Sequence, residues 1–170
     1  MTPFLEMALN NAWANATFYR ALAGLPEGGF QAKRPGFFGS LQATMNHIYE
    51  VDLYYIDALV EGGLGRAVYR REDISDPAEL GRLQAESDAR LAQFCRTLTP
   101  EILLQDRQTE RQDGMTTERV ERLLPHLFQH QVHHRGQAHV QLQDAGVAPP
   151  QLDDFFLDHG RVPSARAYWS

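Results

Sequence analysis

The sequence predicts an all-α fold: a four-helix bundle with long connections and a short C-terminal helix, in one domain over residues 1–170. Three observations lead to this prediction. Apolar residues recur at helical spacing in four long segments, and no segment shows the alternation that is typical of a β-strand. Clusters of glycine and proline separate the segments. A length of 170 residues gives room for one domain with a real core.

The first two helices have recognisable start signals. The first is expected over residues 3–23, because Thr2 can cap it and Pro3 can occupy its first position, where no N–H donor is needed. A glycine- and proline-rich irregular stretch follows it. The second is expected over residues 41–61, with Ser40 as its cap and a Gly-Gly pair after its end.

The third helix has the clearest start signal in the chain. Asp76 can cap it, Pro77 can take its first position, and a glutamate follows three residues after the cap, so we expect a helix over residues 77–98. The next segment, residues 99–116, is polar and contains the turn signal Asp113-Gly114. Its composition is compatible with a short hairpin or with a plain loop.

The fourth helix is expected over residues 118–145, opened by Thr117 and ended by Gly146. Pro125 lies inside this segment, so the helix is expected to kink there or to start at a different residue. Beyond it, residues 152–158 could form a short C-terminal helix.

Charge and composition exclude several classes of partner. The formal net charge is −6, whereas a nucleic-acid-binding protein needs a surplus of lysine and arginine, and the same charge disfavours anionic membrane surfaces. No apolar run approaches the ~20 residues that span a bilayer. Cys95 is the only cysteine, so an intrachain disulfide and a thiolate-rich metal site are both excluded. These features predict a soluble cytoplasmic protein that binds neither nucleic acid nor membrane.

The histidines form the one pattern that indicates chemistry. Five of the seven lie between His126 and His139. On a helix, His126, His130 and His134 share one stripe, because residues four apart lie one above the other. His126 and His134 are about 12 Å apart along the axis, so one ion can use only one neighbouring pair. His47, on the core-facing stripe of the second helix, is the candidate third ligand. Without a metal, each of them would be an ordinary core or surface histidine.

A longer motif carries a family resemblance. The string His130-x-x-x-His134-Arg135-Gly136-Gln137, together with Asn46-His47, resembles the DinB/YfiT-like family of metalloenzymes. Two further segments support it: Trp13-Ala14-Asn15 and Gly146-x-x-Pro149-Pro150. The resemblance implies a four-helix bundle, frequent dimers, and one divalent metal ion bound by His47, His130 and His134, which selects the second of the two pairs.

The resemblance also suggests a reaction. Three histidines leave open coordination positions on zinc or nickel, the two ions that we expect. Relatives include thiol S-transferases, so we expect a metal-dependent enzyme that acts on a small electrophile with a low-molecular-weight thiol. Gln137, on the ligand face, could orient a ligand from the second shell or make a helix–helix hydrogen bond. The rival function is a non-catalytic metal-binding or stress-response module.

A homodimer is the predicted assembly. The first helix carries several aromatic residues and therefore offers more apolar surface than one helix seam needs, namely Phe4, Trp13, Phe18 and Tyr19. Arg135 points about 100° away from His134 on a helix and is interpreted as an ion-pairing or packing residue.

Overall fold

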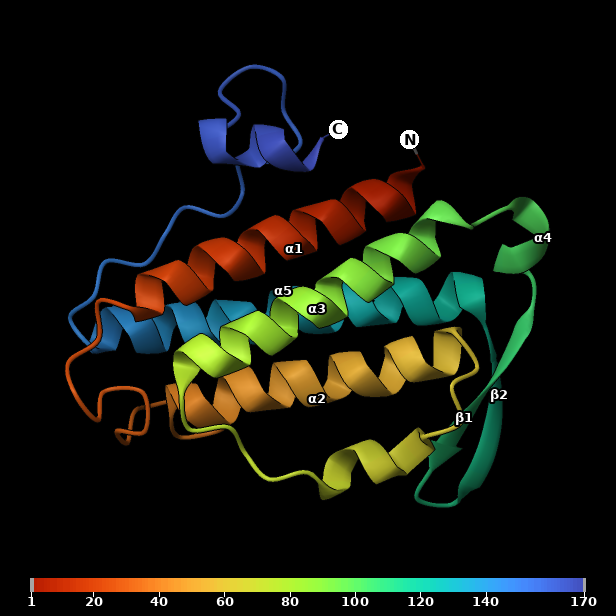
Figure 1. Ribbon diagram of the computed structural model, residues 1–170, viewed down its shortest axis with the longest axis horizontal. Helices are drawn as coiled ribbons and strands as arrows, with labels where there is room; N and C mark the ends of the chain where they lie inside the picture. The colour runs from red at the N-terminus through yellow and green to blue at the C-terminus, as the bar shows by residue number, and fades with distance from the viewer. Residues whose placement is uncertain (1, 170) are drawn as a thin grey trace.

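The structure, a computed structural model, describes residues 2–169, and this part of the chain is mostly helical (Figure 1). Its long helices are α1 (Pro3–Leu22), α2 (Leu41–Leu59), α3 (Pro77–Arg96) and α5 (Val120–Asp144). α1 packs chiefly against α3 and α2 chiefly against α5, and further contacts join α2 to α3 and α1 to α5. The prediction of a mostly helical chain is confirmed, and none of the described helices is long and apolar enough to cross a membrane.

The predicted start signals work as expected at three helices. The side chains of Thr2, Ser40 and Asp76 each accept a hydrogen bond from a backbone N–H in the first turn of α1, α2 and α3. The helices end one or two residues earlier than predicted. α5 begins at Val120 and continues across Pro125, whose missing N–H removes one backbone hydrogen bond.

The all-α prediction is wrong between residues 104 and 119. A two-stranded antiparallel hairpin, β1 (Asp106–Arg111) and β2 (Gly114–Arg119), follows the short helix α4 (Pro100–Leu103). The hairpin alternative for this segment therefore holds, and Asp113 lies in its turn. Thr117, expected to open a helix, lies in β2 instead, where its hydroxyl accepts a hydrogen bond from Gln108 on the opposite strand. β-branched residues favour this extended conformation.

The prediction of a helix over residues 152–158 is also wrong. The backbone carbonyls of Asp154, Phe155 and Phe156 accept hydrogen bonds from Val162 and from the side chain of Arg161, rather than from a following helical turn. The C-terminal helical element is the 3₁₀ helix η2 (Pro163–Tyr168). In Figure 1 this tail lies along the side of α1 that faces away from α3, and Phe155 within it is fully buried.

The tail and the core account for two of the aromatic residues of the first helix, Trp13 and Phe18. The ring of Trp13 packs 5.5 Å from Phe155, and its indole N–H donates to Ser164 at 3.1 Å. Phe18 is fully buried in a second part of the core. Trp13 and Phe18 are thus covered by their own chain, so these two residues no longer support a dimer.

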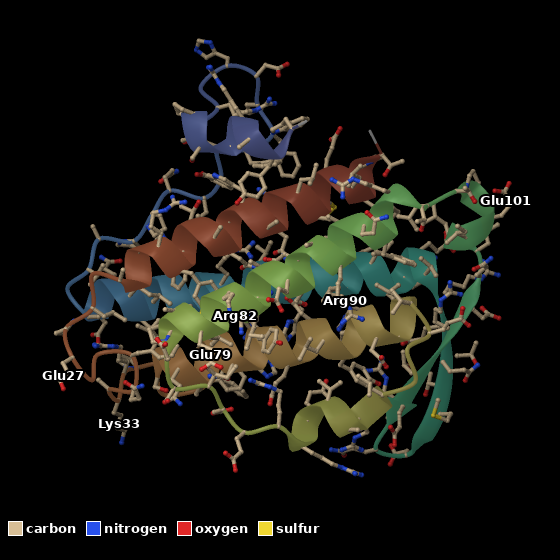
Figure 2. The ribbon with its side chains drawn as sticks, viewed as in Figure 1. Glu27, Lys33, Glu79, Arg82, Arg90 and Glu101 are labelled. Atoms are coloured by element: carbon tan, nitrogen blue, oxygen red, sulfur yellow. The ribbon has the colours of Figure 1, made fainter. Side chains whose placement is uncertain are left out.

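The two faces of α3 both carry polar side chains but differ sharply in solvent exposure. Glu79, Arg82 and Arg90 extend outward into solvent (Figure 2). The opposite face carries Gln84 and Asp88, which are buried although they are polar. Buried polar side chains need partners, and these two find theirs on α1, on α2 and in each other.

Candidate metal centre

Three histidines from two helices converge at the contact between α2 and α5. One ring nitrogen from each of His47, His130 and His134 lies within 4.8 Å of the other two. The Nε2 atoms of His47 and His130 are 3.0 Å apart, and the ring of His134 is centred 4.4 Å from that of His130 and 4.6 Å from that of His47. The three residues named from the sequence are thus brought together, and the group can hold a metal ion.

The arrangement fits the donor set of a divalent ion. Two nitrogens on one tetrahedral zinc, at about 2.0–2.1 Å each, lie about 3.3 Å apart, close to the separation of the His47 and His130 nitrogens. The three side chains are partly buried. Burial, reinforced by the neighbouring His134, lowers the pKa of His47 to about 4 and that of His130 to about 3. Burial also lowers the pKa of His134. The imidazoles are therefore neutral at pH 7, the form that binds metal.

Gln137 holds one of the three rings in a defined orientation. Its carbonyl Oε1 lies 2.9 Å from His134 Nδ1, and its amide nitrogen lies 3.1 Å from Nε2 of the exposed His133. A carbonyl oxygen can only accept, so His134 Nδ1 carries the proton and the Nε2 lone pair stays free. This is the contact that an orienting role requires. By contrast, His130 Nδ1 is buried with no partner in residues 2–169.

We expect Gln137→Leu to weaken metal affinity about 10- to 100-fold, because His134 would lose the acceptor that fixes its tautomer and ring. Gln137→Glu keeps an acceptor at that position and should retain most of the affinity. Competition with a chromophoric chelator measures both constants. Gln129→Leu, at an exposed position of the same helix, is the matched control. Equal affinities for Gln137→Leu and Gln129→Leu would show that Gln137 has no orienting role.

An aromatic residue that the sequence did not single out covers the group. The ring of Phe38 lies 4.3 Å from that of His47 and 5.4 Å from that of His134. It is placed by a loop whose glycines have unusual backbone angles: Gly36 has φ 137° and Gly39 has φ 74°. A Cβ atom at Gly36 would lie 2.9 Å from the side-chain nitrogen of Gln141 on α5. The glycine-rich spacing around Phe38 was visible in the sequence, but its proximity to the histidines depends on the fold.

The rotation of α5 is fixed by the residues that directly follow two of the histidines. Gln131 and Arg135 are buried, and their side chains contact the neighbouring long helices. Arg135 Nη1 donates to Asn11 Oδ1 at 2.8 Å and to Asn15 Oδ1 at 2.9 Å, both on α1. Gln131 Nε2 donates to Asp52 Oδ2 on α2. Because these contacts lock the inner face of α5, they also determine where His130 and His134 point.

Two carboxyl groups complete this buried network, and their surroundings differ. Asp88 on α3 accepts from Asn11, Asn15 and Gln84, with both of its oxygens engaged. Asp52 accepts from Gln84 and Gln131 at Oδ2 alone, while its Oδ1 has no partner in the described residues. Gln84 Oε1 is likewise buried and unpaired there. Of the two roles expected for Arg135, packing and ion pairing, the structure supports packing, because its described hydrogen bonds all go to amide oxygens.

The other histidines lie outside the group. His126 is exposed, with its ring 4.9 Å from that of Tyr55, and His139 contacts the carbonyl oxygen of Pro150 at 3.0 Å. Glu50, one turn after His47, forms an ion pair with Arg71 at 3.7 Å. Cys95 is buried in the core, and burial raises the pKa of its thiol to about 12, so it is not an activated thiolate.

Known proteins resemble this chain in both sequence and fold. The sequence profile of the DinB family matches residues 1–163. Protein DinB of Bacillus subtilis (strain 168) is 26% identical over 150 residues, which cover 84% of this chain and 86% of that protein. The crystal structure of a DinB-like protein from Bacillus subtilis matches with a TM-score of 0.65 at 15% sequence identity, over 89% of this chain and 98% of that one. This second likeness concerns the fold alone.

Proposed function

The chain belongs to the DinB family, and from this premise we propose that it is a metal-dependent enzyme that holds one zinc or nickel ion with His47, His130 and His134. The observation that carries the proposal is the convergence of three neutral, partly buried imidazoles from α2 and α5. A core histidine is ordinarily explained by one hydrogen-bond partner. Three imidazoles that point at one another would repel each other if protonated, so they are held neutral. Their nitrogen lone pairs can then be shared by one ion between them.

The reaction that this site supports best is thiol transfer to a small electrophile. A divalent ion held by three imidazoles supplies Lewis acidity at its open coordination positions, which lowers the pKa of a thiol cosubstrate. Gln137 orients His134, and Phe38 shields the imidazoles from water on one side. Phe37, 82% exposed beside Phe38, offers an apolar surface to the electrophile.

A thiol-transfer assay on protein purified without a histidine tag tests this proposal. Protein loaded with zinc or with nickel is mixed with 1-chloro-2,4-dinitrobenzene and, in turn, cysteine, glutathione, coenzyme A or bacillithiol. With at least one thiol we expect a rate above the protein-free reaction that chelator and His130→Ala abolish and that His133→Ala leaves unchanged. Metal binding without transfer to any of these thiols would favour the rival function, a non-catalytic metal-binding module.

A homodimer stays a prediction of the sequence. Two of the aromatic residues that suggested it, Trp13 and Phe18, are covered within one chain. Sedimentation velocity at micromolar protein concentration measures it. A dimer is the expected species, and a monomer at every concentration would contradict the prediction.

A further inference from the structure

We propose that a second site, on the other side of α5 from the three histidines, binds a small monocarboxylate with an apolar body against Arg135 and Gly136. The site is a cavity of about 530 Å³ between α1, α5 and the C-terminal tail. His134 and Arg135 are consecutive, and successive side chains on a helix diverge by about 100°, so the two sites do not share a face. The proposal is independent of the function proposed for the histidines.

Arg135 supplies the charge. It is only 5% exposed, and its Nη1 makes all of its hydrogen bonds within residues 2–169, to Asn11, Asn15 and Gln131. In that same part of the chain Nε and Nη2 have no acceptor, and they are not among the atoms sealed from solvent. Arg135 lines the cavity, and from the two facts together we infer that this edge of the guanidinium faces it. Nε and Nη2 together form the edge that binds a carboxylate with two parallel hydrogen bonds.

The charge of Arg135 is not used up by the buried network. No described carboxylate lies within ion-pair distance of its guanidinium, because the amides of Asn11 and Asn15 stand between it and Asp88. Burial lowers the pKa of Arg135 to about 10, which leaves the side chain charged at pH 7. A buried cation with an open edge beside a cavity is a strong attractor for an anion.

Gly136 supplies the space. A Cβ atom at this position would meet nothing within 4 Å, so no described neighbour requires a glycine here. Its φ is not in the left-handed region, and glycine inside a helix costs about 1 kcal/mol relative to alanine. The missing side chain therefore leaves room for an occupant next to Arg135.

The walls of the cavity determine the class of ligand. Val132 and Phe156 border it, 56% and 46% exposed, and Leu152 adds a third apolar wall. Asp153 also lines it, and its negative charge disfavours a dianion such as phosphate more than a monoanion. The arrangement thus suits one carboxylate on a hydrophobic body rather than a phosphorylated molecule.

Benzoate, with the neutral isostere benzamide, tests the proposal in the zinc-loaded full chain by NMR titration of backbone amides and of the Arg135 Nε–H. Benzoate should shift Arg135 and the residues around Gly136. Benzamide should bind at least about tenfold more weakly, the factor that corresponds to losing one charge-assisted pair. Gly136→Leu should abolish binding by filling the cavity, and Gly136→Ala should retain it with a higher melting temperature. Asp153→Asn should tighten it.

Two controls separate this site from the histidines and from unfolding. Gly136→Leu should keep the zinc content and helical circular dichroism of the wild type. Equal affinity for benzoate and benzamide, unchanged benzoate binding in Gly136→Leu, or weaker binding in Asp153→Asn would each overturn the proposal. So would a wild-type dimer that Gly136→Leu converts to a monomer, because a second copy would then cover the cavity.

Discussion

Replacing His47, His130 or His134 by alanine is expected to remove the bound ion and the stability that it confers. An ion that bridges α2 and α5 binds only the folded chain, so it raises the free energy of unfolding by mass action. At free metal about 100 times the dissociation constant, this contribution is about 2.7 kcal/mol. The wild type should therefore melt at a higher temperature with zinc than with chelator, and the three variants should show no such difference.

Two matched variants control for the loss of a histidine as such. His126 and His133 lie on the same helix and are exposed, and neither belongs to the converging group. His126→Ala and His133→Ala should keep one ion per chain and the metal-dependent rise in melting temperature. If His126→Ala loses the ion while His134→Ala keeps it, the ion is bound one turn earlier on α5, by His126 rather than His134.

The second large effect is expected at the buried carboxyl groups. Asp88→Asn should lower the free energy of unfolding by about 3 kcal/mol at pH 7.5, the upper end of the usual cost of losing a hydrogen bond to a buried charged group. Burial raises the pKa of Asp88 to about 6, so the carboxylate predominates at that pH. Both of its oxygens accept from amide N–H groups. An asparagine would place an N–H against one of those donors and leave that buried N–H without an acceptor.

Asp52→Asn should have the opposite effect, because Asp52 is expected to be a neutral carboxylic acid. Burial, and then the charge of Asp88, raise its pKa well above the usual range. A proton on Oδ1 would also supply the donor that Gln84 Oε1 lacks, and an asparagine amide can donate in the same place. The substitution should keep every hydrogen bond and stabilise the protein.

The sign of the pH dependence follows from the raised pKa of Asp52. Above its unfolded pKa of 3.8, the folded chain holds a proton at Asp52 that the unfolded chain has released, so wild-type stability falls as pH rises. Asp52→Asn removes this contribution and leaves that of Asp88, whose pKa is also raised. Its advantage over wild type should grow by up to about 1.4 kcal/mol per pH unit between about pH 4 and the folded pKa of Asp52. Urea denaturation of the three proteins between pH 5 and 8 measures it. Equal destabilisation by Asp52→Asn and Asp88→Asn would show that Asp52 is ionised.

The parts of the fold that the sequence predicted well are those set by local chemistry. Thr2, Ser40 and Asp76 cap the helices that they were expected to cap, since a cap needs only a side-chain oxygen and the next turn. The histidine pair on α5 follows from a spacing of four residues. His47 could be matched to that pair because it lies on the core-facing stripe of the second helix. The family motif then chose between His126 and His134.

The features that escaped prediction depend on contacts between distant segments. The hairpin strands are polar, with only Arg107 and Thr109 buried on β1, so they lack the apolar alternation of an ordinary strand. Phe38 reaches the histidines through a loop whose path is set by glycines and by Gln141. The burial of Asn11 and Asn15 beneath Arg135 depends on how α1 packs against α5, which the sequence of α1 alone does not determine.

The most direct test of the metal centre is anomalous diffraction at the zinc edge, on crystals of protein that was purified without a histidine tag and then loaded with zinc. We predict one strong peak per chain between the rings of His47, His130 and His134, with nitrogen ligands at about 2.0–2.1 Å, one of them Nε2 of His134. A peak against His126 or His133, or the absence of any peak at the three histidines, would contradict the account.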